Sequence, residues 1–341
     1  MKRWQKAVVS TVLVLGALVS AGITATIGWR PIIGSRARPL TSRTFEPTPA
    51  RLARGAYLTR GVTPCLVCHS ESQPNEFAVP KPGTDGAGQP WVEPNVPWLT
   101  VPNITPDAET GVGSWSDDAM ARAVREGIGH DGHTLFPLMP YMKLREMSDE
   151  DLASVITYIR TLPPVRKRVP PSTVPFPVNR FINGAPQPIE EPVPEPDRST
   201  AEKRGQYIAT LAVCADCHTP RDSRSQAMED MAFGGGNVMK VQGRPTIATV
   251  NLTPAPAGIP YYTADMFVEV MRTGHIAGRQ LSDVMPWRFY RNMTDADLRD
   301  LFAYLKTLKP VEHFVDNTLP ATQCPRCGHV HGGGERNTKA S

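Results

Sequence analysis

Two copies of one five-residue pattern constrain this chain more than any other feature: Cys65-Leu66-Val67-Cys68-His69 and Cys214-Ala215-Asp216-Cys217-His218. Cys-x-x-Cys-His is the attachment signal of c-type haem. The two thiols add to the haem vinyl groups as thioethers, and the histidine then lies under the iron as its proximal ligand. The alternative is a pair of redox or zinc Cys-x-x-Cys motifs that histidine happens to follow, which the recurrence disfavours. We therefore expect two covalently bound haem c groups.

Length and composition are compatible with two haem-binding units. The chain has 341 residues, enough for two domains, but its 35 prolines and 27 glycines require much of it to be loop. A loop-rich domain of about 110 residues has a thin core, which a porphyrin would fill. The formal net charge is +4, and no dense basic patch with interleaved aromatic residues is present. Nucleic acid is therefore not an expected partner.

The N-terminal segment predicts export across a membrane. Three basic residues precede an uncharged run from Ala7 to Trp29, as in an export signal. This run is long enough to span a bilayer as a helix, with the basic end in the cytoplasm. We favour an uncleaved anchor in the bacterial inner membrane over residues 1–30. A cleaved signal is the alternative, because Val19-Ser20-Ala21 resembles a cleavage site; both place the body on the periplasmic side.

The surroundings of the two motifs indicate an internal repeat. Arg54-Gly55-Ala56-Tyr57 matches Arg204-Gly205-Gln206-Tyr207, Asn103-Ile104-Thr105-Pro106 matches Asn251-Leu252-Thr253-Pro254, and Leu138-Met139-Pro140-Tyr141 matches Val284-Met285-Pro286-Trp287. In each half, a Ser or Thr suited to an N-cap is followed by a glycine suited to a helix end. This pattern predicts a helix over 116–127 in the first half and over 263–274 in the second. A last helix follows Ser148 or Thr294, with apolar residues at helical spacing. Such a repeat predicts two copies of one mostly helical haem domain.

Each iron needs a ligand opposite the histidine, and the repeat selects one methionine in each half. Met139 lies 70 residues after His69, and Met285 lies 67 residues after His218. Each is followed by proline and an aromatic residue. Methionine thioether is a common sixth ligand in c-type cytochromes, where it raises the reduction potential. We therefore predict His69 with Met139 and His218 with Met285 as the axial pairs.

Other methionines and histidines are alternative candidates for the sixth ligand. Met147 and Met293 also align, but both immediately precede helix caps, where a packing role is expected. Bis-histidine ligation is the remaining alternative. His130, His133 and His275 precede the chosen methionines, but they do not align with one another. We expect surface roles for these three histidines.

The C-terminal segment carries a third cysteine pair in Cys324-Pro325-Arg326-Cys327-Gly328-His329-Val330-His331. Glycine, not histidine, follows the second cysteine, so a third haem is not expected. Cys324, Cys327, His329 and His331 bring two thiols and two imidazoles within eight residues, a set that can bind zinc or copper. The favoured expectation is instead a solvent-exposed, disordered tail whose cysteines form a disulfide in an oxidising compartment.

The predicted fold class is mostly α: two tandem class I cytochrome c-like haem domains with long loops, preceded by an N-terminal apolar helix. The predicted segments are an anchor at 1–30, a tether at 31–47, a first domain at 48–165, a proline-rich linker at 166–197, a second domain at 198–312 and a tail at 313–341. The linker composition favours an extended and fairly stiff segment.

With these motifs in place, the chain resembles the dihaem cytochrome c subunits of bacterial membrane-bound alcohol, aldehyde and gluconate-type dehydrogenases. The resemblance rests on the Arg-Gly-x-Tyr, Cys-x-x-Cys-His, Asn-x-Thr-Pro and Met-Pro motifs and their repeats. It implies an electron-transfer subunit that accepts electrons from a dehydrogenase catalytic subunit or another redox protein. It also implies delivery to the respiratory chain through the quinone pool or a terminal oxidase. That family often has three haem domains, and this chain carries motifs for two.

The expected ligand sets argue against substrate chemistry at the irons. If histidine and methionine fill both axial positions of each haem, no position is open to a substrate, and no catalytic residue is predicted. A dihaem enzyme, of the cytochrome c peroxidase or thiosulfate dehydrogenase type, is the alternative. A peroxidase needs an iron that can open to hydrogen peroxide, and the matching Met-Pro segments in both halves argue against this.

Overall fold

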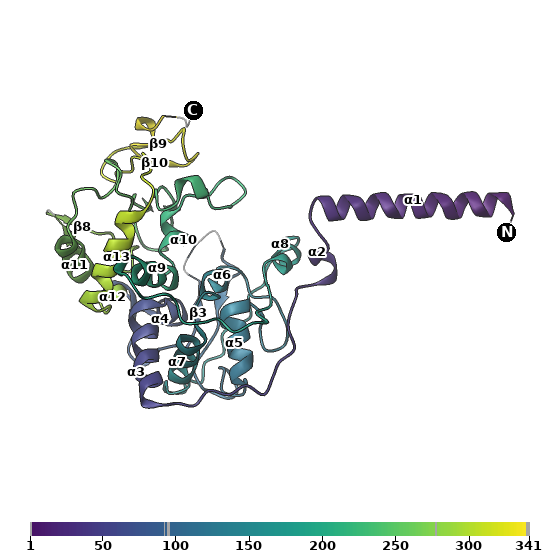
Figure 1. The fold of residues 1–341 in the computed structure, drawn as a ribbon, viewed down its shortest axis with the longest axis horizontal. Helices are drawn as coiled ribbons and strands as arrows, with labels where there is room; N and C mark the ends of the chain where they lie inside the picture. The colour runs from purple at the N-terminus through teal and green to yellow at the C-terminus, as the bar shows by residue number, and fades with distance from the viewer. Residues whose placement is uncertain (1, 92, 94–95, 277, 339–341) are drawn as a thin grey trace.

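A single long helix, α1 (Arg3–Ala25), extends away from the rest of the chain (Figure 1). The structure is a computed structural model that describes residues 2–91, 93, 96–276 and 278–338. None of the α1 residues is buried, and the helix is long and apolar enough to cross a membrane. The expected apolar helix is therefore confirmed, although Met1, where the expected anchor begins, lies outside the described residues. The short helix α2 (Arg30–Ile33) follows it.

The first half of the body is built from short helices joined by long loops. Its helices are α3 (Pro49–Tyr57), η1 (Leu58–Val62), α4 (Cys65–His69), α5 (Asp117–Glu126), α6 (Tyr141–Leu144) and α7 (Asp149–Ile159). Two antiparallel strand pairs lie in its loops: β1 (Ser72–Gln73) with β2 (Glu76–Pro80), and β3 (Gln89–Pro90) with β4 (Thr100–Val101). The haem-attachment motif occupies α4.

The second half repeats the order of the five α-helices, although its η3 turn and its second strand pair lie at different places. Its helices are α9 (Ala201–Leu211), α10 (Cys214–His218), η3 (Glu229–Met231), α11 (Ala264–Thr273), α12 (Trp287–Tyr290) and α13 (Asp295–Thr307). The antiparallel pairs are β5 (Val238–Met239) with β6 (Ile247–Ala248), and β7 (His275–Ile276) with β8 (Arg279–Gln280). The mostly helical class is thus confirmed, and the second attachment motif occupies α10.

The predicted helix ends are confirmed by their hydrogen bonds. The Ser116 hydroxyl accepts from the Ala119 N–H, and the Thr263 hydroxyl accepts from the Met266 N–H. Each helix then stops at a glycine in the left-handed region, Gly127 with φ 73° and Gly274 with φ 72°. Side chains other than glycine rarely adopt this conformation, which is why glycine ends these helices.

In each half, the first and last helices cross at a glycine. A Cβ added to Gly55 would lie 1.9 Å from the Ser154 carbonyl oxygen, and one added to Gly205 would lie 1.9 Å from that of Asp300. The helices α3 and α7, and likewise α9 and α13, therefore pack backbone against backbone. This contact explains the glycine in both Arg-Gly-x-Tyr motifs.

Replacing Gly205 with alanine is expected to force α9 and α13 apart. Overpacking of this kind costs about 1–3 kcal/mol of unfolding free energy. Urea unfolding of the haem-loaded chain, followed by circular dichroism, measures the loss. Gly184→Ala is the matched control, because nothing lies within 4 Å of a Cβ at that position. Equal stability of the two variants would contradict the close helix crossing.

The buried apolar core is continuous between the two halves. It includes buried apolar residues on the inner faces of the last helices: Leu152, Val155, Ile156, Ile159, Leu298, Leu301, Phe302 and Leu305. Residues of α9 and α12 belong to the same cluster as residues of η1 and α7. The halves therefore share one core.

Two equivalent tyrosines join the halves reciprocally. Tyr207 of α9 donates its hydroxyl to the Asp151 carboxylate at 2.9 Å and accepts from the Ser148 N–H at 3.1 Å. Tyr57 of α3 donates to Asp297 and accepts from the Thr294 N–H at 3.2 Å. Each tyrosine thus binds the first turn of the last helix in the other half. This exchange is the pattern of a two-fold interface, formed here within one chain.

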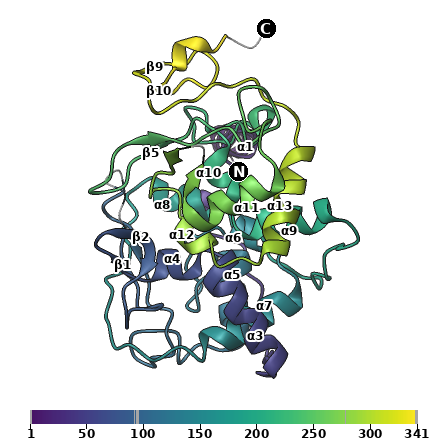
Figure 2. The ribbon, with the colours of Figure 1, turned by 90° about the vertical axis from the view of Figure 1, so that its left-hand side faces the viewer.

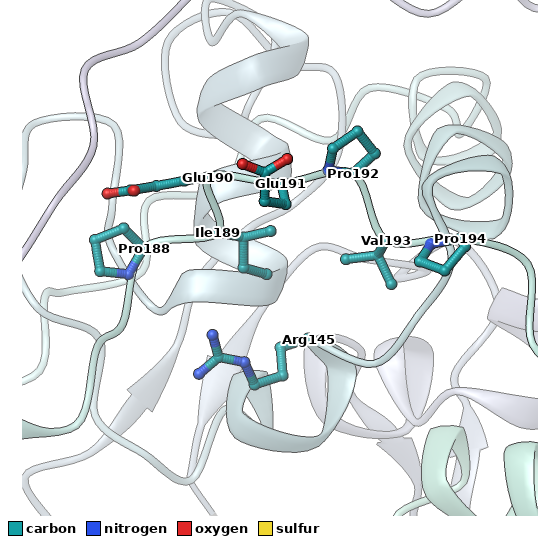
Figure 3. Close-up of a pocket in the computed structure, with 8 residues that line it drawn as sticks. All are labelled: Arg145, Pro188, Ile189, Glu190, Glu191, Pro192, Val193 and Pro194. Carbon is teal, nitrogen blue, oxygen red and sulfur yellow. The ribbon is translucent and has the colours of Figure 1, made fainter.

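The proline-rich segment packs back along the first half. The Thr173 N–H donates to the Trp98 carbonyl at 3.0 Å, and the Asp149 N–H donates to the Val193 carbonyl at 2.9 Å. Figure 3 shows the extended stretch 188–194 passing over Arg145, which follows α6. Part of the segment turns into α8 (Val178–Phe181) and η2 (Ile182–Gly184).

The C-terminal segment is folded, which corrects the expectation of an exposed, disordered tail. It forms an antiparallel hairpin, β9 (Ala321–Gln323) with β10 (Val330–Gly332), and a short turn of helix, η4 (Gly334–Arg336). The hairpin lies at one end of the molecule, beside the C-terminus (Figure 2). Cys324 and Cys327 are buried against Met231 and Val311. The segment acquires order because these cysteines cover apolar side chains of the second half.

Candidate haem sites

The two motif histidines are held in the same way. His69 is buried, and its Nδ1 lies 2.8 Å from the Pro102 carbonyl oxygen. His218 is buried, and its Nδ1 lies 2.8 Å from the Val250 carbonyl oxygen. A carbonyl accepts only from a protonated nitrogen, so Nδ1 carries the proton and Nε2 remains for a metal. This orientation by a backbone carbonyl is typical of metal-ligating histidines.

The protonation of these histidines also fits metal ligation. Burial lowers the pKa of both His69 and His218, and the hydrogen bond to the carbonyl only partly offsets it. A lowered pKa keeps the imidazole neutral near pH 7, as a ligand must be. Both histidines are thus oriented and neutral.

The Asn-x-Thr-Pro motifs hold the carbonyls that orient these histidines. In the second half, the Asn251 side chain accepts from the Thr253 N–H at 2.9 Å and donates to the Val311 carbonyl at 2.7 Å. In the first half, Asn103 accepts from the Thr105 N–H at 2.9 Å and donates to a valine carbonyl at 2.7 Å. Pro102 and Val250 immediately precede these asparagines. The motif therefore fastens the histidine-binding loop to the chain that follows the last helix.

The two attachment motifs lie near each other. Burial, together with the neighbouring thiols of Cys65 and Cys217, raises the pKa of the Cys68 thiol to about 12. Cys217 belongs to the other motif. The Tyr290 hydroxyl donates to the Ala212 carbonyl at 2.7 Å, and its pKa is raised by burial and by thiols of both motifs. The attachment points therefore lie close enough to influence each other, near the boundary of the two halves.

The predicted methionine ligands occupy equivalent places before α6 and α12. Met139 and Met285 are partly buried and pack against the shared core. In each case the carbonyl accepts from the N–H two residues later, at 2.8 and 2.7 Å. Met147 and Met293 are fully buried core residues, as expected from their position before the caps. Ligation by Met139 and Met285 remains a prediction.

The three histidines that are alternative ligand candidates lie on the surface. His130, His133 and His275 are all exposed. The His130 ring stacks on the Trp115 ring, with 4.3 Å between the ring centroids. His275 Nδ1 lies 2.9 Å from the Thr273 carbonyl oxygen. Their exposure favours methionine over these histidines at both irons.

Two buried indole nitrogens support the fit of a haem group. The Nε1 atoms of Trp91 and Trp287 are buried without a hydrogen-bond partner among the described residues. A buried donor left unpaired costs about 1–3 kcal/mol, so such atoms usually have a partner outside the protein chain. Trp287 lies two residues after Met285, where an acceptor such as a haem propionate would satisfy it. Together with the oriented histidines and paired cysteines, this donor set fits haem c.

Sequence reasoning missed the carbonyls of Pro102 and Val250 and the position of Tyr290. The signal for the carbonyls was present, because both immediately precede a repeated Asn-x-Thr-Pro motif. Tyr290 has no such signal, since Leu144 takes its place in the first half. It becomes apparent only when the two motifs are brought together in space.

Comparison with known proteins agrees with this geometry. The cytochrome c family model matches residues 202–309. A diheme cytochrome c-type protein of Cereibacter sphaeroides is 30% identical over 228 residues, which cover 63% of this chain and 73% of the relative. The fructose dehydrogenase cytochrome subunit of Gluconobacter japonicus is 26% identical over 285 residues, which cover 77% of this chain and 54% of the relative. The gluconate 2-dehydrogenase cytochrome c subunit of Pantoea cypripedii is 33% identical over 191 residues, which cover 53% of this chain and 41% of the relative.

The chain spans about half the length, or less, of the dehydrogenase subunits that it matches. It spans most of the diheme cytochrome, and the attachment motifs, the oriented histidines and the family match all lead to the same assignment. The chain belongs to the cytochrome c family.

Proposed function

We propose that this chain carries two haem c groups and transfers electrons between them. One haem is attached to Cys65 and Cys68, with His69 and Met139 as axial ligands. The other is attached to Cys214 and Cys217, with His218 and Met285. The observation that carries the proposal is the identical placement of both motif histidines, each bonded through Nδ1 to a carbonyl at 2.8 Å. The two halves then correspond to domains at 48–165 and 198–312.

The position of the attachment motifs supports transfer within the molecule. Haem iron supplies the one-electron chemistry, and the protein sets its potential through the axial ligands and burial. Since thiols of both motifs lie around Tyr290, the thioether edges of the two haems would meet at the boundary between the halves. The shared core and the reciprocal tyrosines would hold the two groups at a fixed separation.

The N-terminal region supports attachment to the inner membrane. At the base of α1, α2 packs against α8 and η2 of the linker. Large apolar side chains in both segments are exposed: Trp29, Ile32, Ile33, Phe176, Val178 and Phe181. Apolar and aromatic side chains beside a spanning helix are suited to the membrane interface. We infer that α1 anchors the chain and that the body lies on the periplasmic side.

The relatives supply the class of partner. Several are cytochrome subunits of fructose, alcohol and gluconate dehydrogenases. We infer that a dehydrogenase catalytic subunit donates electrons to this chain and that the quinone pool or a terminal oxidase accepts them. The inferred role is electron transfer, without substrate chemistry at either iron.

Purification of the full chain from solubilised membranes tests this function. We expect two haems per chain, both low-spin in the resting state, and co-purification of a dehydrogenase subunit whose substrate reduces both haems. Replacing both Cys214 and Cys217 with serine should leave one haem per chain. A five-coordinate, high-spin iron in the resting protein that turns over peroxide would contradict the proposal and favour a dihaem enzyme.

A further inference from the structure

Four buried side chains with metal-binding atoms lie close together where the C-terminal segment packs against the second half. His313, Cys324, Cys327 and His331 place their ligand atoms within 4.8 Å of one another. Their exposed fractions are 0%, 0%, 5% and 2%. They lie outside both haem-attachment motifs, and neither the family match nor the relatives' names account for them. Two thiols and two imidazoles form one of the common ligand sets of structural zinc.

The backbone around the two cysteines forms a tight turn that directs both sulfurs to one point. The Cys327 N–H donates to the Cys324 sulfur at 3.5 Å, and the Gly328 N–H donates to the Cys324 carbonyl at 3.0 Å. Gly328 has φ 77°, a conformation that favours glycine. The sequence Cys-Pro-Arg-Cys-Gly thus closes on itself between β9 and β10. N–H donors to sulfur stabilise the thiolate form that a metal requires.

The two histidines are oriented from outside the cluster. His313 Nδ1 lies 2.8 Å from the Gly234 carbonyl, which leaves its Nε2 at 3.5 Å from the Cys324 sulfur. His331 Nδ1 lies 3.2 Å from the Gly332 carbonyl. The His331 Nε2 is buried and has no hydrogen-bond partner among the described residues. A buried nitrogen without a partner, on a residue of this cluster, is therefore available to a metal.

The cluster is buried, so water cannot compensate charges that form on its thiols. His313 and His331 each have their Nδ1 at a backbone carbonyl oxygen, which leaves both Nε2 atoms available as ligands. Metal binding displaces the thiol protons and neutralises the resulting charge, as in other cysteine sites.

We propose that His313, Cys324, Cys327 and His331 bind one Zn²⁺ ion in a closed tetrahedral site. Zinc bonds of about 2.3 Å to sulfur and about 2.0–2.1 Å to nitrogen, at tetrahedral angles, place the sulfur and nitrogen atoms about 3.6 Å apart. The 3.5 Å between His313 Nε2 and the Cys324 sulfur agrees with that separation. All four positions are filled by the protein, so the ion is structural.

The ligand set differs from the one considered from the sequence. His329 is partly buried, and its Nε2 lies 2.7 Å from the Arg221 carbonyl oxygen, outside the cluster. His331 lies within β10 and is buried, whereas His329 precedes that strand and is only partly buried. His313, eleven residues before Cys324, supplies the fourth ligand from the segment that follows α13.

The site fastens the C-terminal segment to the loop behind His218. His313 bonds the Gly234 carbonyl, and the next residue, Gly235, donates its N–H to the His218 carbonyl at 2.7 Å. At the equivalent place in the first half, Lys167 bonds the Gly88 carbonyl at 2.6 Å and pairs with Glu71. The second half therefore uses a metal-ligating histidine where the first half uses an ion pair.

Metal analysis of the full, haem-loaded chain tests the proposal. We expect one zinc per chain by mass spectrometry of the elements, in protein purified without added metal or a metal-affinity tag. Zinc K-edge X-ray absorption, which the haem iron does not obscure, should show two sulfur and two nitrogen neighbours at about 2.3 and 2.0 Å. Cys324→Ser and His331→Ala should each lose at least tenfold in zinc content. His329→Ala is the matched control and should retain zinc.

Thiol chemistry provides a readout that does not depend on a variant folding. The haem-linked cysteines are thioethers under the proposed function, so free thiols arise only at Cys324 and Cys327. Wild-type protein denatured with a chelator, without reductant, should alkylate at both positions. A Cys324–Cys327 disulfide, or wild-type protein without zinc, would overturn the site. Two haems per chain in the same sample would show that this failure leaves the electron-transfer proposal intact.

Discussion

Replacing Met285 with alanine is expected to convert the second iron from low-spin to high-spin while the first iron stays low-spin. Thioether ligation fills the sixth position, and alanine leaves that position to water or to no ligand. Electron paramagnetic resonance of the oxidised protein should therefore show about half of the low-spin signal replaced by high-spin iron. Met139→Ala should give the same result at the first site.

The control for this experiment is Met142→Ala. Met142 is near Met139 in sequence but is 51% exposed. At the equivalent position the second half has Arg288 instead of a methionine. Its removal should leave both irons low-spin. Retention of two low-spin irons in Met285→Ala would show that another side chain ligates the second haem and would overturn the predicted axial pair.

Met285→His adds a measurement of potential. Histidine should keep the iron six-coordinate and low-spin but lower its potential, since thioether stabilises ferrous iron better than imidazole does. We expect a decrease of about 0.2 V at the second haem, within the span of about 0.8 V that axial ligands set. Potentiometric titration should resolve one shifted and one unshifted haem. An unchanged pair of potentials would count against Met285 as a ligand.

The features that were predictable from sequence are the local ones. The attachment motifs, the helix caps at Ser116 and Thr263 and the glycine stops at Gly127 and Gly274 depend on residues within a turn of each other. Their chemistry is therefore visible in a short window. Repetition added one longer-range inference, because two copies of a Met-Pro-aromatic segment indicate a shared role even when the intervening loops differ.

The contacts that were not predictable join residues far apart in the chain. His313 belongs to the cluster with Cys324 and Cys327, but no sequence motif surrounds it. Its role depends on how the β9–β10 hairpin packs against the segment that follows α13. The disordered-tail expectation failed for the same reason, since polar and glycine-rich composition hides two cysteines that bury against Met231 and Val311. Short-range composition predicts disorder correctly only when no distant surface is available for packing.

The contact between the two halves also could not be predicted from the sequence, although the tyrosines that form it occur in both repeats. Tyr57 and Tyr207 were recognised as matching positions, but a match does not reveal whether each tyrosine binds its own half or the other one. The structure shows that each binds the other half. The exchange makes the two repeats dependent on each other for the polar contacts at the ends of α7 and α13.

Replacing both tyrosines with phenylalanine is therefore expected to weaken the junction between the halves. Tyr207 is buried and bonds a carboxylate, so Tyr207→Phe should cost about 1.5–3 kcal/mol, as for hydrogen bonds to charged groups. Tyr57 lies in a more exposed contact, and Tyr57→Phe should cost about 0.5–1.5 kcal/mol. The double variant should lose about 2–4.5 kcal/mol in urea unfolding. Tyr261→Phe, at a side chain 60% exposed, should cost nothing measurable.

The pH dependence distinguishes the carboxylate contact from simple packing. Burial raises the pKa of Asp151, but hydrogen bonds from Arg54 and Tyr207 outweigh it and hold that pKa below its ordinary value. A carboxylate with a lowered pKa stabilises the fold above its unfolded pKa of about 3.9, and this contribution is lost as the pH falls through the folded value. The stability difference between wild type and Tyr207→Phe should therefore narrow below about pH 4. A difference that stayed constant into acid would assign the loss to packing alone.

The same double variant tests whether the junction sets the separation of the haems. Because thiols of both attachment motifs are near enough to Tyr290 to raise its pKa, a loosened junction should alter electron exchange between the haems more than it alters either haem's potential. Flash reduction of one haem, followed by re-equilibration, measures that exchange. Slower exchange with both potentials unchanged would assign the tyrosines to positioning. Unchanged exchange at reduced stability would leave the shared apolar core as the element that holds the two sites together.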